Sequence, residues 1–315
     1  MNISSFDYFV VLARERSFTK AAQQLHITQQ SLSSHIASLE EELGCQLLVR
    51  HVPLELTYAG TVFLRYAGTV QRELKNMRRE FCDITHNQKG ILRIGIAFTR
   101  GRAIMPTLIP SFQALYPNIG IELSEGANQA LYYKLLNGEV DLAIANFSNI
   151  MPNVEFCDFY PEEVVLLISR GLFEQTLGRK TDKLAGEIEG GNLSCLRNCP
   201  FVLGNLDDIA GKIGRTMIEK SGFTPIVKAQ SDNIETLLSL CFQGVGACFS
   251  PINLIPTAVL TDELRQAYIF HLGEQAAYPI RFGFLKSNYQ WKIISEFIRV
   301  SKDTLLCSDS IIPIA

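Results

Sequence analysis

The sequence lacks the features that mark several large classes of protein. No run of apolar residues reaches the about 18 that suggest a membrane-spanning helix, and the N-terminus enters an amphipathic segment directly, without a signal peptide. No nucleophile elbow, Gly-rich phosphate loop or paired metal-ligand motif is present, and His271 is the only histidine after residue 86. We therefore expect a cytosolic protein that is not an enzyme, with no metal, no cofactor and no membrane association.

Strong positive charge is also missing. The chain has 29 Lys and Arg against 32 Asp and Glu, and this formal net charge of −3 argues against general affinity for nucleic acid. Residues 1–89 carry ten Lys and Arg against nine Asp and Glu, so any phosphate contact must come from a few placed side chains and from helix N-termini. The eight cysteines are expected to be free thiols in a reducing compartment. With 47% hydrophobic residues, the 315 residues suffice for two or three globular domains.

Residues 17–60 hold the most informative pattern, two short helical segments and a tight turn. Residues 6–13 and 19–25 have helical spacing, His26 and Ile27 make the turn, and Thr28 is a suitable N-cap for a further helix that ends at Gly44. An apolar stripe follows that helix at Leu32, Ile36, Leu39 and Leu43. Short side chains point away from the stripe and leave room to approach base edges in the DNA major groove, namely Gln30, Ser33, Ser34 and Ala37. Spacing alone fits the solvated face of an ordinary core helix about equally well.

More positions of this region form a pattern in order and spacing: Phe9, Ser17, Phe18, Thr19, Ala21, Ala22, Leu25, Gln29, Leu32, Ser33, Ile36, Leu39, Glu40, Leu43, Gly44, Arg50, Thr57, Ala59 and Gly60. The pattern resembles the N-terminal region of the LysR-type transcriptional regulators. The resemblance implies a winged helix-turn-helix, mainly α, over residues 1–60, a linker helix over 61–88, and a two-lobed α/β effector domain over 89–315 that is related to periplasmic binding proteins. The residues expected to contact double-stranded DNA are Thr28, Gln29, Gln30, Ser31, Ser33, Ser34, His35 and Arg50.

The chain departs from the family pattern at several of these positions. Gln30, Ser34 and His35 stand where the family often has Pro, Arg and Gln. The wing, often rich in arginine, reads His51-Val52-Pro53, so phosphate anchoring by the wing is expected to rest mainly on Arg50. The affinity of one DNA-binding domain for one site should then be modest. Specific binding should need two or more DNA-binding domains at once.

The segment from Tyr58 to about His86 contains no proline and predicts one long helix. Apolar residues recur along it at alternating steps of four and three, an a/d seam over about three heptads. We expect this seam to hold a homodimer or homotetramer through Phe63, Val70, Leu74, Met77 and Phe81, with Ala67 and Ile84 completing the seam. Two paired helices would present two recognition helices to one duplex, so a pseudo-palindromic site is expected. The alternative is a helix packed on its own domain.

From Ile91 onward, short apolar runs alternate with helical stretches, which predicts two α/β lobes. Lobe I is expected at about 89–162 and 268–315, and lobe II at about 163–267, with crossings near 161–164 and 267–271. The expected strands are 91–98, 119–123, 140–145, 164–168, 201–203, 226–229, 247–249 and 280–285. The expected helices are about 103–115, 128–137, 208–220, 233–243 and 290–306.

A small-molecule effector should bind where the carboxyl ends of the strands face the space between the lobes. After the strand 91–98 the chain reads Thr99-Arg100-Gly101-Arg102 and then enters a helix, so free N–H groups and two guanidinium groups predict a site for a carboxylate or other small anion. The resembling family often uses this turn and the loop that ends at Asn128, and further polar candidates are Asn146, Asn205 and Ser250. The alternative is that Arg100 and Arg102 are solvated surface charges.

Two other functions remain as alternatives. Cys195 and Cys199 have i, i+4 spacing, and a thiol pair of this kind could sense oxidants. We favour a packing role, because no His or Lys lies close in sequence to lower a thiol pKa. The other alternative is a cytosolic solute-binding module with an appended helix-turn-helix. The sequence names neither the effector nor the regulated genes.

Overall fold

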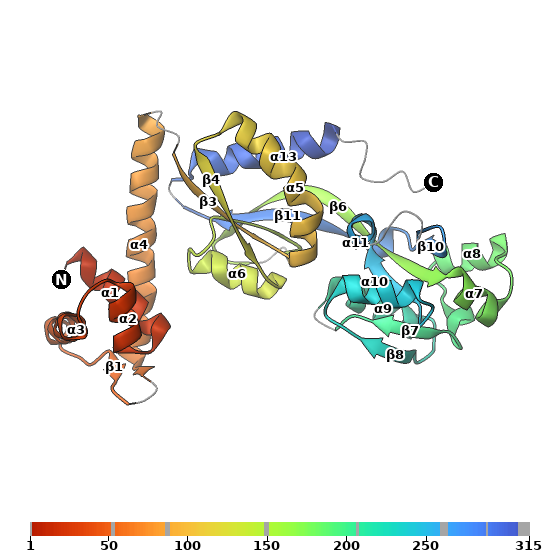
Figure 1. Ribbon diagram of the computed structural model, residues 1–315, viewed down its shortest axis with the longest axis horizontal. Coiled ribbons are helices and arrows are strands. Elements are labelled where there is room, and N and C mark those ends of the chain that lie inside the picture. Colours follow the sequence, from red (N-terminus) through yellow and green to blue (C-terminus); the bar gives the residue numbers. More distant parts are fainter. Residues whose placement is uncertain are drawn as a thin grey trace. The chain divides into compact units, whose positions relative to one another are not determined.

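The computed structural model describes residues 2–51, 54–85, 89–147, 151–205, 208–258, 264–287 and 289–307 (Figure 1). The chain divides into two compact units. Unit 1 comprises Met1–Lys89, Asn137–Glu139 and Ser287–Lys292, and unit 2 comprises Gly90–Leu136, Val140–Lys286 and Ile293–Ala315. Among the described helices, none is both long enough and apolar enough to span a membrane.

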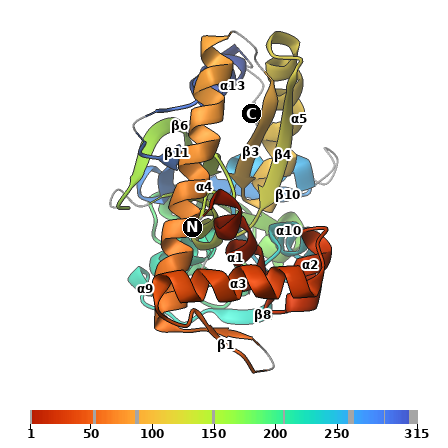
Figure 2. The ribbon, with the colours of Figure 1, turned by 90° about the vertical axis from the view of Figure 1, so that its left-hand side faces the viewer.

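Unit 1 begins with three helices, a two-stranded wing and one long helix (Figure 2). Its elements are α1 (Ile3–Glu15), α2 (Phe18–Gln24), α3 (Gln29–Leu43), β1 (Leu48–Val49), β2 (Glu55–Leu56) and α4 (Tyr58–Ile84). The capping residues explain where the helices begin, because the side chains of Asn2, Ser17, Thr28 and Thr57 each accept a backbone N–H of the first turn. Gly44 ends α3 in the left-handed conformation at φ 68°.

The core of unit 1 confirms most of the predicted apolar stripe. Leu32, Ile36 and Leu39 are buried with α1 and α2, whereas Leu43 at the end of α3 is 39% exposed. Phe63 of α4 belongs to this core, where its ring stacks on Phe6 and meets Phe9 edge to face. The beginning of α4 is thus part of the winged domain.

The expected dimerisation seam along α4 is buried in the first half of the helix and exposed in the second half. Phe63 and Ala67 are buried inside unit 1, so the expectation that Phe63 lies at a subunit contact is corrected: its ring is used by the domain's own core. Val70 and Leu74 are half-buried, and Met77 and Phe81 are 47% and 61% exposed. Among the described residues of α4, the exposed part of the seam is its second half, at Met77, Phe81 and Ile84.

Glycine is required where the wing meets α4. A Cβ on Gly60 would lie 2.0 Å from the Leu47 carbonyl oxygen, so any larger residue would push β1 away from the helix. The Leu47 carbonyl also accepts the Thr57 N–H at 3.0 Å. The root of the wing and the start of α4 are therefore in direct backbone contact.

Residues 287–292 of unit 1 pack on the second half of α4. Asp83 accepts hydrogen bonds from the Tyr289 hydroxyl and, at 3.2 Å, from the Lys292 N–H. The Arg79 guanidinium lies 4.0 Å from the ring centroid of Trp291, a cation–π contact. Although this segment joins two elements of unit 2, it belongs structurally with the long helix.

In unit 2, lobe I is built on three parallel strands. The order is β3 (Gly90–Ile96), α5 (Phe98–Leu115), β4 (Ile119–Glu125), α6 (Asn128–Leu136) and β5 (Leu142–Ala145). β3 lies between β4 and β5 and is parallel to both, which confirms the predicted parallel arrangement. β11 (Ala277–Leu285) adds an antiparallel strand beside β5, and α13 (Lys292–Cys307) closes the chain (Figure 1).

The largest difference from the expected strands is β6 (Val154–Ser169), a single strand that runs through both lobes. Its first part pairs with β11 in lobe I, and its second part pairs with β9 (Cys248–Pro251) and β10 (Ala267–His271) in lobe II. Only residues 164–168 were expected as a strand, because Pro161 and the glutamates beside it argue against one. The segment 267–271, expected as a crossing, is strand β10.

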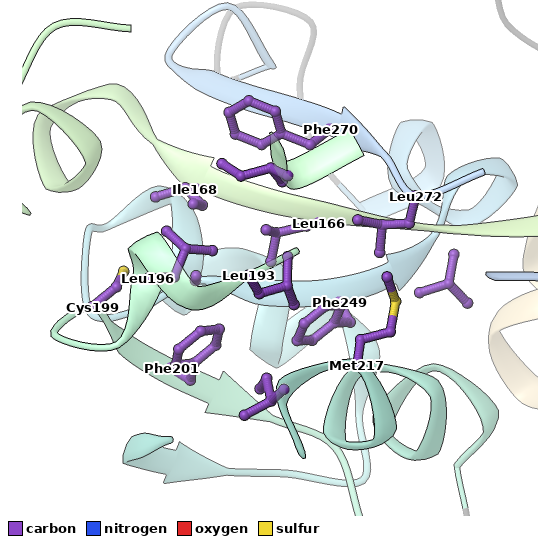
Figure 3. Packing of buried hydrophobic residues seen from close by; sticks show 14 of the residues in the cluster. Leu166, Ile168, Leu193, Leu196, Cys199, Phe201, Met217, Phe249, Phe270 and Leu272 are labelled. Atoms are coloured by element: carbon purple, nitrogen blue, oxygen red, sulfur yellow. The ribbon is translucent and has the colours of Figure 1, made fainter. Parts of the chain in front are cut away.

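Lobe II surrounds the second half of β6 with helices and a small parallel sheet. Its remaining elements are α7 (Arg170–Leu177), α8 (Asp182–Glu189), η1 (Ser194–Leu196), β7 (Pro200–Leu203), α9 (Ile209–Lys220), β8 (Ile226–Gln230), α10 (Ile234–Phe242), η2 (Ile252–Leu254), α11 (Ile255–Ala258) and η3 (Glu274–Ala276). Leu166 and Ile168 of β6 meet Phe249, Phe270 and the short helix η1 in one apolar cluster (Figure 3). This core joins the far half of β6 to the helices around it.

Candidate functional site

The outward face of α3 carries polar groups, and its middle positions have short side chains. Gln30, Ser34 and Ala37 are exposed, and Ser31 and Ser33 are half-buried at the sides of the helix. The Thr28 hydroxyl accepts the Ser31 N–H at 3.1 Å and fixes the beginning of the helix. Such a face can approach base edges closely.

Two of the expected DNA-contacting residues lie at the flanks of α3, where it meets its neighbours. The Gln29 side-chain oxygen accepts the Thr19 hydroxyl of α2 at 3.2 Å. The His35 ring lies 4.9 Å from the Tyr8 ring of α1, centroid to centroid. Both side chains already have a partner within unit 1.

Arg50, the expected phosphate anchor, is also engaged. Its Nη2 lies 2.9 Å from Oε2 of Glu40 on α3, while half of the arginine side chain remains exposed. Val52 and Pro53 of the wing lie outside the described residues.

At the other predicted site, helix α5 begins five residues earlier than expected, at Phe98. Thr99, Arg100 and Arg102 therefore lie within its first turns and not in a loop before it. Gly101 allows this, because a Cβ there would come within 3.2 Å of the Ile96 side chain and 3.3 Å of a Glu125 carboxylate oxygen. The N-cap residue is Ala97, which provides no side-chain hydrogen bond to the free N–H groups.

Arg100 is the centre of a buried polar cluster. It is 6% exposed, and its Nη2 donates to Oε2 of Glu162 at 2.7 Å, with the glutamate fully buried on β6. The Tyr278 and Tyr160 hydroxyls donate to the same carboxylate. Arg100 Nε has no hydrogen-bond partner among the described residues. The solvated-charge alternative is therefore wrong for Arg100.

The ionisation of this cluster follows from its burial. Burial alone would lower the pKa of Arg100, but the Glu162 carboxylate reverses the effect and leaves this pKa above its ordinary value. Burial and the same carboxylate raise the pKa of Tyr278 and of Tyr160. At neutral pH both phenols are therefore protonated and act as hydrogen-bond donors, and Arg100 is charged.

Arg102 forms a bridge between the lobes. Its Nη1 lies 2.7 Å from Oε1 of Glu235, in the first turn of α10 in lobe II. The arginine side chain is 54% exposed, so solvent screens this ion pair strongly. The two arginines have separate acidic partners and do not converge on one free anion site.

The other candidates for the effector site lie near strand ends, with the exception of Ser250. Asn128 begins α6 and is half-buried, and Asn146 follows β5 and donates to the Pro279 carbonyl at 3.0 Å. Asn205 follows β7, is exposed and donates to Asp232. Ser250 lies inside β9, fully buried, with its hydroxyl directed to the Pro251 carbonyl.

Comparison with known proteins settles which family has this arrangement. Residues 3–61 match the family model for bacterial regulatory helix-turn-helix proteins of the lysR family, and residues 85–305 match the model for the LysR substrate binding domain. The chain belongs to the LysR family. It is a DNA-binding transcriptional regulator with an effector-binding domain, and this is a family of regulators, not of enzymes.

Relatives span nearly the whole chain. An uncharacterized HTH-type transcriptional regulator of Bacillus subtilis (strain 168), YcgK, is 31% identical over 97% of this chain and 95% of the relative. Full-length OxyR from Pseudomonas aeruginosa has a TM-score of 0.73 at 20% identity, covering 96% of this chain and 95% of OxyR. Full-length CbnR complexed with its target DNA has a TM-score of 0.62 at 20% identity, covering 96% and 100%. At this identity the two structures show the shared LysR fold.

Sequence reasoning missed the acidic partners of Arg100 and Arg102. Glu162, which pairs with Arg100, stands two residues before the apolar run 164–168, and a carboxylate at the edge of a buried strand was the available signal. Glu235 could have been noted as an acidic residue in the first turn of a predicted helix. Nothing in the sequence indicated that Tyr160 and Tyr278 meet at Glu162, because they are brought together by the pairing of β6 with β11.

The cysteines of lobe II are packing residues in the structure. Cys195 lies in η1 and Cys199 follows it, so the two do not share a face of an α-helix. Cys199 is buried beside Leu196 and Phe201 (Figure 3), and burial raises its pKa to about 12. Burial, with a contribution from Glu187, also raises the pKa of Cys195. The described cysteines are free thiols.

Proposed function

We propose that a small organic anion, bound between the lobes at the beginning of α5, controls how this LysR-family regulator binds DNA. The observation that supports this most directly is Arg100 Nε, a buried donor with no partner among the described residues. It lies in the first turn of an 18-residue helix whose N-terminus has no side-chain cap. A carboxylate there would satisfy Nε and the free N–H groups together.

Glu162 shapes what such a site recognises. Because its carboxylate balances the charge of Arg100, the pair offers an incoming anion a fixed donor and little net attraction. A hydrogen bond to a charged group contributes about 1.5–3 kcal/mol, so directional bonding at short range should decide affinity. The remaining candidates, Thr99, Arg102, Asn128, Asn146, Asn205 and Ser250, would orient the rest of the molecule.

Thermal unfolding of the full-length protein tests this proposal with a panel of mono- and dicarboxylates, inorganic phosphate, neutral sugars and amines. Stabilisation is expected from carboxylates, and it should disappear in Arg100→Lys, which keeps the charge facing Glu162 but lacks Nε–H. The matched control is Arg299→Lys, an exposed arginine of α13 that pairs with Glu296 outside the candidate site, which should retain the effect. Stabilisation by neutral or cationic compounds alone, or an unchanged response in Arg100→Lys, would place the effector elsewhere.

We further propose how the DNA is bound. The outward face of α3 would lie in the major groove, with Thr28, Gln29, Gln30, Ser31, Ser33, Ser34 and His35 at or beside the contact. Two subunits paired through Val70, Leu74, Met77 and Phe81 of α4 would present two such helices, which implies a homodimer or homotetramer and a pseudo-palindromic site. The domains would then be residues 1–60, 61–88 and 89–315, acting in the cytoplasm, where the DNA is.

A further inference from the structure

We infer that Glu40 and Arg50 form a clamp that sets the position of the wing relative to the recognition helix α3, and that Arg50 is a positioning residue instead of a phosphate anchor. Glu40 lies on α3 with a side chain that is only 10% exposed. Its Oε1 accepts the backbone N–H groups of Leu47 at 2.8 Å and of Leu48 at 3.2 Å, and its Oε2 accepts Arg50 Nη2 at 2.9 Å.

The three donors flank the beginning of the wing. Leu47 and Leu48 are buried, and β1 begins at Leu48. The Leu47 carbonyl in turn accepts the N–H of Thr57, the N-cap residue of α4. The root of the wing is therefore held between α3 and α4, and Arg50 completes the part of this network that faces solvent.

Electrostatics argues against phosphate anchoring by Arg50. A guanidinium 2.9 Å from a carboxylate presents little net charge to a third group, and the carboxylate repels a phosphate that approaches the pair. Both oxygens of Glu40 are already occupied by donors, so Glu40 cannot turn away without leaving two backbone N–H groups unpaired.

Replacing Glu40 with Gln distinguishes the two roles by the sign of the effect. If Arg50 anchored phosphate, Glu40→Gln would free the guanidinium, remove a repulsive charge and raise affinity for any duplex. If the pair is a clamp, Glu40→Gln should lower affinity for a specific site roughly tenfold and leave affinity for a random duplex unchanged. Glu219→Gln, the same charge change at an exposed position of α9 outside the DNA-binding domain, is the control and should alter neither affinity.

The salt dependence of DNA binding gives an independent readout with Arg50→Gln. A clamp residue should lower specific affinity while leaving the slope of log K against log salt concentration unchanged, whereas a phosphate anchor should reduce the slope by about one per head. The double variant Glu40→Gln, Arg50→Gln should bind no more weakly than either single variant. A reduced slope, or higher affinity in Glu40→Gln, would overturn the inference; if Glu40→Gln fails to fold, the Arg50→Gln slope decides alone.

Discussion

At the scale of single residues, the buried ionisable groups described above are either paired or kept neutral. Arg100 and Glu162 are buried as a pair, and two tyrosine hydroxyls supply further hydrogen bonds to the glutamate. Removing one partner of a buried pair leaves an uncompensated charge and costs about 3–5 kcal/mol. This is why Arg100→Lys, which keeps the charge, probes the effector site better than a neutral substitution.

The buried thiol of Cys199 should be inert at neutral pH. Because burial raises its pKa to about 12, the thiolate, which is the reactive form, is scarce until the pH approaches that value. Iodoacetamide at pH 8 should therefore label exposed Cys45 much faster than Cys199, as peptide mass spectrometry can measure. Unfolding should remove the effect of burial and make Cys199 as reactive as an exposed cysteine.

An oxidant-sensing role would show a different pattern. Mild peroxide should leave DNA binding unchanged in the wild type and in the Cys195→Ser, Cys199→Ser double variant. A reversible peroxide-dependent change in the wild type that is absent from the double variant would make the thiols functional.

At the scale of elements, the contact between the wing and α4 depends on the absence of one side chain. Gly60→Ala would place a Cβ 2.0 Å from the Leu47 carbonyl oxygen, so we expect a loss of stability in unit 1 and weaker specific DNA binding. Gly68→Ala, in the same helix, is the matched control, since no described atom lies within 4 Å of a Cβ there. It should stabilise the helix by about 0.5–1 kcal/mol. Chemical denaturation of both variants would show whether the two substitutions differ in sign.

The elements differ in how well the sequence predicts them. α3 could be predicted because its cap at Thr28, its apolar stripe and its stop at Gly44 are all local signals. The beginning of α5 could not, because Ala97 provides no cap signal and the close approach at Gly101 depends on Ile96 and Glu125. The first part of β6 could not be predicted either, because its pairing with β11 outweighs the local effect of Pro161. The Arg100–Glu162 pair was likewise invisible, since it joins residues 62 positions apart.

At the scale of the whole molecule, assembly should depend on the exposed half of the α4 seam. Met77→Asp would place a charge where two seams meet, at a cost of several kcal/mol in an apolar interface, so the variant should sediment as a monomer and lose cooperative DNA binding. Thr69→Asp, an exposed position off the seam on the same helix, should leave the oligomer intact. If Met77→Asp sediments as the wild type does, α4 does not pair the subunits through this seam.

The central claim is that the outward face of α3 reads DNA sequence, and a mobility-shift assay with one bulky substitution on that face tests it most directly. The probe is a duplex that the full-length wild type selects from a random-sequence pool. Ser34→Trp should abolish binding, because the indole ring on this exposed position keeps the helix from the base edges, while Thr107→Trp, on an exposed position of α5, should bind as the wild type does. Unchanged binding and an unchanged footprint with Ser34→Trp would contradict the assignment of α3 as the recognition helix.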